Sequence, residues 1–436
     1  MLLLCYNPRR SHFSKSQVSP VPEFTSDFDH QDDHFSSAFA ILREAIKQRA
    51  FPAASVAITH AGELVALKSF GHFVFEEDLQ GAPLLADFAR SGDFDSSDTT
   101  VIPATLFDLA SLTKVIATTT AAMILYERSL LELDAPIIVT LPEFLLDATG
   151  NTDPRRRTVT FRMLLAHSSG LPAYEKLYLK ARTREQLLNA AFTMPLTSDP
   201  GTRAEYSDIG FIVLGAALER LAKKRLDVFC QHEIFGPLEM SQTTFNPPTD
   251  LRPKIPPTAD ERSECGAGAP ASEKHAMSPQ PSVRLQRPRS TLRNRIIQGE
   301  VQDENAYVLG GVAPHAGLFS TAQDVATFAH AILQGGEPIL RPETIALFAA
   351  RNATPGSSRA LGWDTPSSPS QSGKHFGPNS YGHLGYTGTS LWIDPDRELS
   401  VILLTNRTWP DCSNQDIKQV RPKFHDSVVE ALKNLH

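Results

Sequence analysis

The chain reads SLTKVIATTTAAMIL from Ser111 to Leu125, and the prediction of the fold is built outward from this segment. After Lys114 the residues are those of a largely apolar helix, which must be buried. Ser111 lies in the first turn, where a side chain meets the positive end of the helix dipole. Lys114 lies on the same face one turn later, with its Cβ atom roughly 5–6 Å from that of the serine. The segment predicts a buried helix that brings a hydroxyl and an amine together.

This Ser-x-x-Lys pair has two interpretations. Serine is a weak nucleophile until another group takes its proton. Lys114 can take that proton only if its pKa falls from about 10.4 towards 7, through burial and a second cation or phenolate. In the other interpretation Ser111 caps the helix and Lys114 extends from the core towards solvent. About one such pair is expected by chance, so the pair alone does not decide between them.

Strands are predicted at both ends of the chain. Residues 54–59 and 64–70 are β-rich and flank a turn, and residues 389–393 and 399–404 form a second such pair. A helix is expected from about Pro422 to Leu435. The central part is mostly helical, with helices expected over Ser111–Glu127, Phe161–Ala166, Arg184–Ala191, Ile209–Lys223 and Ala322–Leu333. The predicted fold is α/β (α+β): one antiparallel sheet built from both chain ends and flanked by helices, with an inserted, mostly helical domain.

The length of 436 residues exceeds what one hydrophobic core usually fills. Residues 1–36 lack periodicity and are expected to be a disordered arm. Residues 37–110 and 300–436 are assigned to the sheet domain, and residues 111–262 to the helical domain. The proline-rich stretch from residue 247 to about 292 is expected to be flexible, with residues 263–292 assigned as the insert itself.

Composition excludes several classes of protein. The formal net charge of -7 gives no footprint for nucleic acid, and no apolar run is long enough for a membrane helix. The four cysteines are far apart and suggest neither a disulfide scaffold nor a zinc site. Motifs of metalloproteases and phosphate-binding loops are missing, so no cofactor and no metal are expected. His30 and His34 could hold a metal, but a solvated tail is the favoured interpretation.

The amino terminus lacks the pattern of a secretory signal. The sequence as written therefore predicts a cytoplasmic protein, whereas a misassigned start site would allow a periplasmic one. A monomer is expected.

Three further segments change the interpretation of Ser111. Residues 200–208 form a turn that holds Tyr206 just ahead of a helix, residues 381–389 form a glycine-rich edge strand, and residues 405–407 end the last strand. In this order they resemble the serine β-lactamase and penicillin-binding protein superfamily, especially class C β-lactamases, family VIII carboxylesterases and D-aminoacyl hydrolases. The resemblance runs from about residue 37 to the end of the chain, without the insert.

The resemblance implies a role for each matching residue. Ser111 would be the nucleophile and Lys114 its proton-transfer partner. Tyr206 would act as a general base or pass a proton to the leaving group. The backbone N–H groups of Ser111 and Tyr386 would form the oxyanion hole. Whether Lys114 or Tyr206 takes the first proton stays open.

The resemblance also implies substrate contacts. His383-Leu384-Gly385 stands where the family has Lys-Thr-Gly. Asn406 aligns with a class C residue that meets the substrate carboxylate, and Tyr174 falls where class C has an amide-binding side chain.

Three departures from the family bear on the substrate. Asp208 replaces an asparagine that donates a hydrogen bond to the substrate, and an ionised carboxylate only accepts. His383 replaces a lysine, and Leu384 replaces a threonine whose hydroxyl binds a carboxylate. These changes weaken recognition of β-lactams and D-Ala-D-Ala ends, although Arg407 could restore a cation.

The sequence therefore predicts a serine hydrolase that acts through an acyl-enzyme on a small-molecule ester or amide. A β-lactamase or D-Ala-D-Ala carboxypeptidase is the first alternative. A non-catalytic penicillin-binding sensor or scaffold is the second. His167 and His315 are expected to support loops, and the favoured role of residues 303–305 is to cap a turn rather than to line the cleft.

Overall fold

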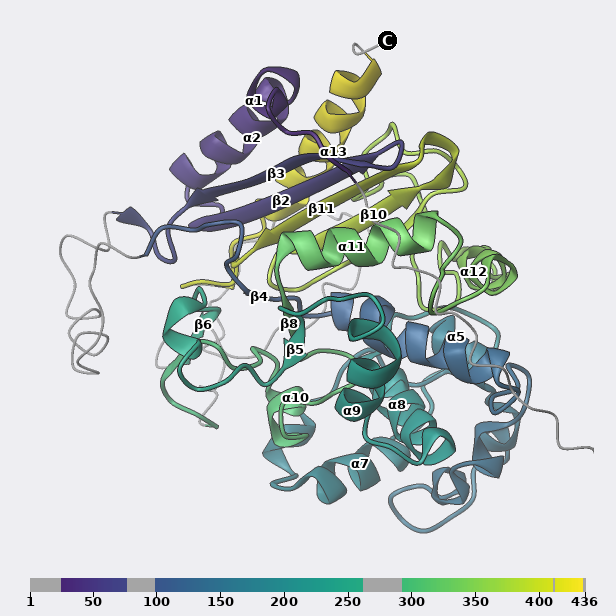
Figure 1. Ribbon diagram of the computed structural model, residues 1–436. Helices are drawn as coiled ribbons and strands as arrows, with labels where there is room; N and C mark the ends of the chain where they lie inside the picture. The colour runs from purple at the N-terminus through teal and green to yellow at the C-terminus, as the bar shows by residue number, and fades with distance from the viewer. Residues whose placement is uncertain (1–24, 77–98, 262–291, 411, 434–436) are drawn as a thin grey trace, which may run out of the picture.

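The structure is a computed structural model that describes residues 25–76, 99–261, 292–410 and 412–433. A six-stranded sheet forms its centre, with strand order β1-β3-β2-β11-β10-β9. The strands are β1 (Thr25–Ser26), β2 (Ala53–His60), β3 (Glu63–Gly71), β9 (Tyr381–Leu384), β10 (Ser390–Asp394) and β11 (Leu399–Thr405). All pairs are antiparallel except β1 with β3, which is parallel. The two chain ends therefore share one sheet through the pairing of β2 with β11 (Figure 1).

Two smaller sheets lie outside the central one. They consist of β4 (Phe107–Asp108), β8 (Leu318–Ser320) and β5 (Thr244–Phe245), and of β6 (Ala259–Asp260) with β7 (Ile296–Ile297). The α-helices are α1 (Gln31–His34), α2 (Ser36–Lys47), α5 (Thr120–Glu127), α6 (Phe161–Leu165), α7 (Arg184–Phe192), α8 (Asp208–Ala222), α9 (Leu226–Cys230), α10 (Glu304–Val308), α11 (Ala322–Leu333), α12 (Pro342–Ala349) and α13 (Ile417–Lys433). Two π-helical segments are η2 (Lys114–Thr119) and η7 (Gln231–Phe235).

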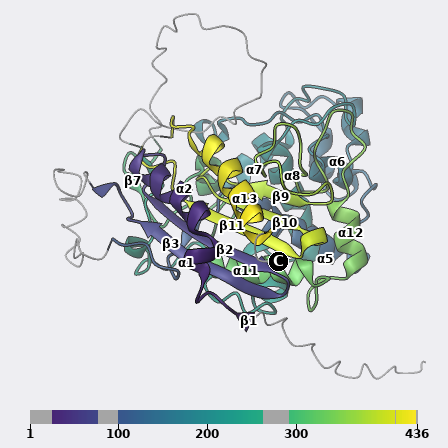
Figure 2. The same ribbon diagram turned by 90° about the horizontal axis from the view of Figure 1, so that it is seen from above.

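Helices cover both faces of the central sheet. Helices α2 and α13 lie side by side over one face, as the view from above shows (Figure 2). Their apolar residues, such as Phe39 and Phe424, join those of the sheet in one buried cluster. Helix α11 packs on the opposite face, and its side chains continue into a second cluster shared with η2, α5 and α8. This second cluster joins the sheet to the helical part of the chain.

The predicted fold class and most predicted elements are confirmed. The four expected strands form β2, β3, β10 and β11, and α11 has the predicted bounds. Helix α13 starts at Ile417, five residues before the predicted start. Proline is common in the first turn of a helix but not in its interior. Pro422 lies inside the helix instead, because the buried side chains of Ile417 and Arg421 extend the packing upstream.

Two expectations of disorder are corrected. Residues 25–36 of the expected arm form β1, α1 and the start of α2, since the edge of β3 provides a partner for β1 and Gln31 binds the backbone of Leu67. The proline-rich stretch is ordered up to residue 261 and contains β6. The rest of the arm and nearly all of the predicted insert over 263–292 lie outside the described residues.

No helix within the described ranges is long and apolar enough to cross a membrane. Cys230 is a buried free thiol, whereas Cys412 is disulfide-bonded.

Candidate active site

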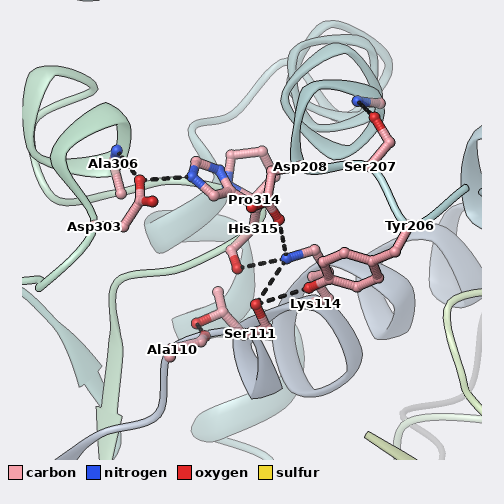
Figure 3. Close-up of polar contacts among 12 residues, drawn as sticks. Ala110, Ser111, Lys114, Tyr206, Ser207, Asp208, Asp303, Ala306, Pro314 and His315 are labelled. Atoms are coloured by element: carbon pink, nitrogen blue, oxygen red, sulfur yellow. Dashed lines mark hydrogen bonds and ion pairs between the residues drawn. The ribbon is translucent and has the colours of Figure 1, made fainter. Parts of the chain in front are cut away.

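Ser111 lies immediately before the helical segment and meets two polar side chains (Figure 3). Lys114 Nζ donates a hydrogen bond to Ser111 Oγ over 3.0 Å, and the Tyr206 hydroxyl donates to the same oxygen over 2.8 Å. Both distances are those of good hydrogen bonds. The two neighbours come from different parts of the chain, so the fold itself assembles this three-residue group.

The backbone around Ser111 is held on both sides. Ala110 has a positive φ of 47°, and its N–H donates to Asp108 Oδ1 over 2.8 Å. Thr113 Oγ1 donates to the carbonyl of Ala110 and accepts from the N–H of Leu318. The helix after it begins with a π segment rather than the predicted α-helix, and such segments occur often at functional sites.

Lys114 is fully buried and has three acceptors around its ammonium group. They are Ser111 Oγ, the carbonyl of His315 at 3.0 Å and Asp208 Oδ1 at 2.7 Å (Figure 3). Burial alone would lower the pKa of Lys114, but the Asp208 carboxylate and Tyr206 reverse this effect and leave the pKa above its ordinary value. The ion pair with Asp208 therefore favours the ammonium form of Lys114.

The loop at Pro314 and His315 approaches Lys114 closely because α8 carries a glycine. A Cβ atom on Gly215 would lie 2.4 Å from the ring of Pro314, so no other residue fits there. Thr118 Oγ1 donates to the Pro314 carbonyl over 2.6 Å and fixes the loop on the π segment. The next carbonyl, that of His315, then points at Lys114 Nζ.

Tyr206 is placed by the turn that leads into α8. Ser207 caps this helix, because its Oγ accepts from the N–H of Gly210 over 2.8 Å. The N–H of Ser207 donates to His167 Nδ1 over 3.0 Å, and the imidazole packs on the phenol with ring centroids 4.7 Å apart. His167 thus supports the loop as expected, and it also orients Tyr206. Burial raises the pKa of Tyr206, and Lys114 opposes that rise.

The glycine-rich strand and the turn at its end lie beside the residues that precede Ser111. Thr389 Oγ1 donates to the carbonyl of Leu109 over 3.0 Å, and Thr387 Oγ1 donates to that of Asp108 over 2.8 Å. A Cβ atom on Gly385 would lie 2.6 Å from the Leu109 carbonyl, which explains the glycine. The turn that contains Tyr386 is therefore held against the backbone next to Ser111.

A model of the family described as Beta-lactamase matches residues 38–421. The chain is also 31% identical over 373 residues to N-acetylmuramyl-L-alanine amidase of Bacillus subtilis strain 168, a match that covers 82% of this chain and 77% of that protein. The chain belongs to the β-lactamase family. The expected superfamily is thereby confirmed, and the protein is a serine hydrolase of that family.

Two further similarities agree with membership of the β-lactamase family. A putative D-alanyl-D-alanine carboxypeptidase of Escherichia coli K12 is 31% identical over 318 residues, which cover 70% of this chain and 69% of that protein. The structure of EstCE1, described as a hydrolase with promiscuous acyltransferase activity, gives a TM-score of 0.66 at 22% identity, with 91% of this chain and 99% of that chain covered. At this identity the second likeness concerns the fold alone.

The residues that the family suggests as substrate contacts differ in how close they lie to Tyr206 and Ser111. His383 is buried, packs near Tyr206 with ring centroids 5.9 Å apart, and shares a 2.8 Å hydrogen bond with the Leu384 carbonyl. Burial lowers the pKa of His383 well below its usual value, and Arg359 and Lys114 add to this. The imidazole that replaces the family lysine is therefore neutral.

Asn406 and Arg407, the last residues of the predicted substrate side, contact backbone groups of the protein itself. Asn406 is completely buried, accepts from the N–H of Ala53 and donates both amide hydrogens to the carbonyls of Phe73 and Pro257. Arg407 donates to the carbonyls of Tyr386, Cys412 and Asn414. Backbone groups therefore take up all the hydrogen-bonding groups of the Asn406 amide, and they engage Nε and Nη1 of Arg407.

Arg359 is a cation at this site that the sequence did not reveal. Its Cζ atom lies 5.1 Å from the centroid of the Tyr206 ring, and its side chain is 23% exposed. Asp364 is its ion-pair partner among the described residues, at 3.8 Å, which is too long for a hydrogen bond. Arg359 stands outside every motif, so only the folded chain brings it to the phenol.

A buried polar cluster lies behind Lys114. Asp303 caps α10, as expected, and its Oδ1 also lies 2.9 Å from His315 Nε2. The Tyr174 hydroxyl is buried with no hydrogen-bond partner among the described residues, and burial followed by Asp303 and Glu304 raises its pKa. Tyr174 is therefore a buried phenol beside the carboxyl groups of Asp303 and Glu304. Within the described ranges, no group of three His, Cys, Asp or Glu side chains could hold a metal ion.

Proposed function

We propose that this protein hydrolyses the amide or ester bond of a small molecule through an acyl-enzyme on Ser111. The observation that carries the proposal is the convergence of Lys114 Nζ and the Tyr206 hydroxyl on Ser111 Oγ. A cation beside the serine oxygen stabilises the charge that develops there during attack. The phenol is positioned to exchange protons with the nucleophile and with the leaving group.

The oxyanion hole would consist of the backbone N–H groups of Ser111 and Tyr386. The contacts of Thr387 and Thr389 with residues 108 and 109 support this assignment, because they bring the two backbone segments together. Backbone donors of this kind need no reorganisation when charge develops on the carbonyl oxygen.

Amides are our preferred substrates among the two classes, because the similar proteins named above include an amidase and a carboxypeptidase. The substrate contacts that replace the family motif are neutral: a neutral His383 imidazole and the aliphatic side chain of Leu384. A substrate with a neutral group on this side suits these contacts. Asp208, which only accepts hydrogen bonds when ionised, gives the acyl side no amide donor.

A D-alanyl-D-alanine carboxypeptidase is the second candidate, and Arg359 favours it. Its guanidinium beside Tyr206 offers the positive charge that His383 lacks, and guanidinium groups bind carboxylates in a bidentate way. The name of the Escherichia coli protein points in the same direction.

One substrate panel tests both candidates. Wild type and Ser111→Ala would be assayed on p-nitrophenyl butyrate, N-acetylmuramyl-L-alanine, a D-Ala-D-Ala peptide and nitrocefin. We expect turnover of the first two by wild type and none by Ser111→Ala, which should also take up no fluorophosphonate label. Retained ester hydrolysis in Ser111→Ala would refute the acyl-enzyme on Ser111, whereas stoichiometric labelling without any turnover would indicate a penicillin-binding sensor.

We propose that the protein works as a monomer, since the Ser111 group is assembled from one chain. Light scattering after size exclusion should give a mass near 47.8 kDa. The cytoplasmic assignment stays a prediction of the sequence.

A further inference from the structure

The two backbone N–H groups of the proposed oxyanion hole belong to peptide groups whose carbonyls are themselves hydrogen-bonded. The N–H of Ser111 shares its peptide group with the carbonyl of Ala110. This carbonyl accepts from Thr113 Oγ1 over 2.6 Å and from the N–H of Thr113 over 3.0 Å. Two neutral donors therefore polarise the peptide group of Ser111.

The N–H of Tyr386 shares its peptide group with the carbonyl of Gly385. This carbonyl accepts from the N–H of Gly388 over 3.1 Å and from Arg421 Nη2 over 2.7 Å. A hydrogen bond from a charged donor is shorter and stronger than one from a neutral donor. The peptide group of Tyr386 thus has a cation on its carbonyl, whereas that of Ser111 has a hydroxyl.

Arg421 is bonded to carbonyl groups rather than to a carboxylate within the part of the chain that the structure describes. The residue is 5% exposed, and its guanidinium also donates to the carbonyls of Gly388 and Thr389 over 3.2 and 2.9 Å. A buried charge without a counter-ion is costly, and a neutral donor would satisfy the same carbonyls at lower cost. The positive charge at this position therefore points to a use for the charge itself.

We propose that Arg421 is a positioning residue of the oxyanion hole, and that its charge strengthens the N–H of Tyr386 as a donor through the Gly385–Tyr386 peptide group. This inference rests on the proposed function. A donor on a peptide oxygen draws electron density from the peptide nitrogen, which makes its N–H more positive. The negative oxygen of the tetrahedral intermediate gains more from this than the neutral carbonyl of the bound substrate does.

Two other basic side chains near the turn do not have this position. Arg407 Nε donates to the Tyr386 carbonyl over 2.8 Å, but that carbonyl belongs to the next peptide group, which carries the N–H of Thr387. His425 shares a 3.2 Å hydrogen bond with Ser390 Oγ, and burial lowers the pKa of His425 to about 3, so its ring is neutral. Of the three, Arg421 is the cation bonded to the peptide group of the proposed oxyanion donor.

The test compares Arg421→Gln, which removes the charge, with Arg421→Lys, which retains it. The measurements are kcat/KM for p-nitrophenyl butyrate and Ki for butylboronic acid, whose adduct with serine is tetrahedral and negatively charged like the intermediate. Because one oxyanion donor is weakened and not lost, Arg421→Gln should lower kcat/KM about 10-fold and raise Ki by a similar factor. Arg421→Lys should restore most of both.

Arg156→Gln is a matched control. Arg156 is also buried and donates to backbone carbonyls, those of Phe144 and Phe192 over 2.9 and 2.7 Å and that of Met194. Its loss should lower the free energy of unfolding without changing kcat/KM or Ki, since none of these partners belongs to the site. An equal loss of activity in Arg156→Gln would show that activity follows stability and would overturn the proposal.

A spectroscopic signature reports on the oxyanion hole itself. Stronger donors lower the infrared stretching frequency of the acyl carbonyl, which can be measured for a 13C-labelled butyryl group on Ser111. The frequency should be higher in Arg421→Gln than in wild type and Arg421→Lys. In wild type it should lie below that of ethyl butyrate in water, a comparison that needs no variant at position 421.

Three further results would overturn the proposal. One is an Arg421→Gln protein with the wild-type kcat/KM, Ki and frequency. Another is a loss in Arg421→Lys as large as in Arg421→Gln, because the charge would then not matter. The third is a wild-type frequency at or above that in water, which decides the question even if the variants fail to fold. Any of these, together with an inactive Ser111→Ala, would reject the role of Arg421 and leave the acyl-enzyme intact.

Discussion

Two buried cations, Lys114 and Arg421, contact different parts of the candidate site. Lys114 has a carboxylate as partner and donates to the nucleophile. Arg421, on α13, has no carboxylate partner among the described residues and donates to the carbonyls of Gly385, Gly388 and Thr389. Burial lowers the pKa of Arg421 to about 9, whereas the pKa of Lys114 is raised.

The two cations differ in role: Lys114 contacts the proposed nucleophile, whereas Arg421 holds a turn of the backbone. Arg421 fixes the 385–389 turn, whose backbone is proposed to bind the oxyanion, and it needs only carbonyl partners for that purpose. Lys114 lies beside Ser111 Oγ, the proposed nucleophile, and Asp208 provides an opposite charge at 2.7 Å. Loss of Lys114 should therefore affect the rate most, and loss of Arg421 should affect stability most.

The largest effect is expected for Lys114→Met. Removal of the cation that faces Ser111 Oγ should lower kcat/KM for p-nitrophenyl butyrate about 1,000-fold or more. Lys68→Met is a matched control, because Lys68 pairs with the exposed Asp32 far along the chain from the site. Activity of Lys114→Met within tenfold of wild type would mean that the cation is not needed.

Arg421→Met should act on stability. It removes the guanidinium donor from three buried carbonyl groups, of which those of Gly385 and Thr389 keep a backbone N–H donor. We expect this loss to lower the free energy of unfolding by about 3 kcal/mol in urea titrations. Arg162→Met removes an arginine that pairs with the exposed Asp134 and should cost less than about 1 kcal/mol. Equal losses in the two variants would show that Arg421 does not hold the turn.

Glu304 is a buried carboxyl group whose ionisation burial disfavours, and its substitution is the third prediction. Burial, together with Asp303, raises the pKa of Glu304 from 4.5 to about 8. The folded protein then keeps this carboxyl protonated while the unfolded chain ionises it, so wild-type stability falls as pH rises from 4.5 to 8. Relative to wild type, Glu304→Gln should therefore gain about 1–4 kcal/mol between pH 5 and 8.5.

The exposed variant Glu343→Gln is the control for Glu304→Gln. It should show no such pH-dependent difference from wild type in the same urea titrations. If the difference in the free energy of unfolding between Glu304→Gln and wild type is the same at pH 5 and pH 8.5, burial does not keep Glu304 protonated in the folded protein.

The smallest effect is expected for Arg359→Met, which removes a partly exposed cation. KM for a peptide with a free carboxylate should rise about 3- to 10-fold, and KM for the neutral ester should not change. Arg157→Met, at another exposed arginine, controls for the loss of charge as such. If KM rises equally for the peptide and for the neutral ester, Arg359 does not bind the carboxylate of the peptide.

The sequence predicted the parts of the fold that repeat a simple pattern. The strands at both chain ends are β-rich segments joined by recognisable turns, and α11 has a continuous apolar face. The positions of these elements therefore follow from the sequence pattern. It also predicted that Ser111, Lys114 and Tyr206 belong to one site, and these three side chains converge in the structure. The π segment and strand β1 depend on tertiary contacts and were missed.

The substrate side was predicted less well, for a physical reason. Alignment with the family places Asn406 correctly at the end of β11, but it does not show that three backbone groups use up its amide. Arg359 lies in a loop whose sequence has no recognisable motif, and its contact with the Tyr206 ring is seen only in the folded chain. Motifs therefore predicted the position of the proposed nucleophile. Which charged side chains can contact a substrate depends on packing, which the motifs do not describe.

The most direct test of the account is the site of covalent labelling. Wild-type protein treated with a fluorophosphonate, or quenched during turnover of an ester, would be digested and its peptides analysed by mass spectrometry. The account predicts a single adduct on the peptide that contains Ser111, and its loss in Lys114→Met at the same exposure. An adduct on another residue, with Ser111 unmodified in an active enzyme, would contradict it.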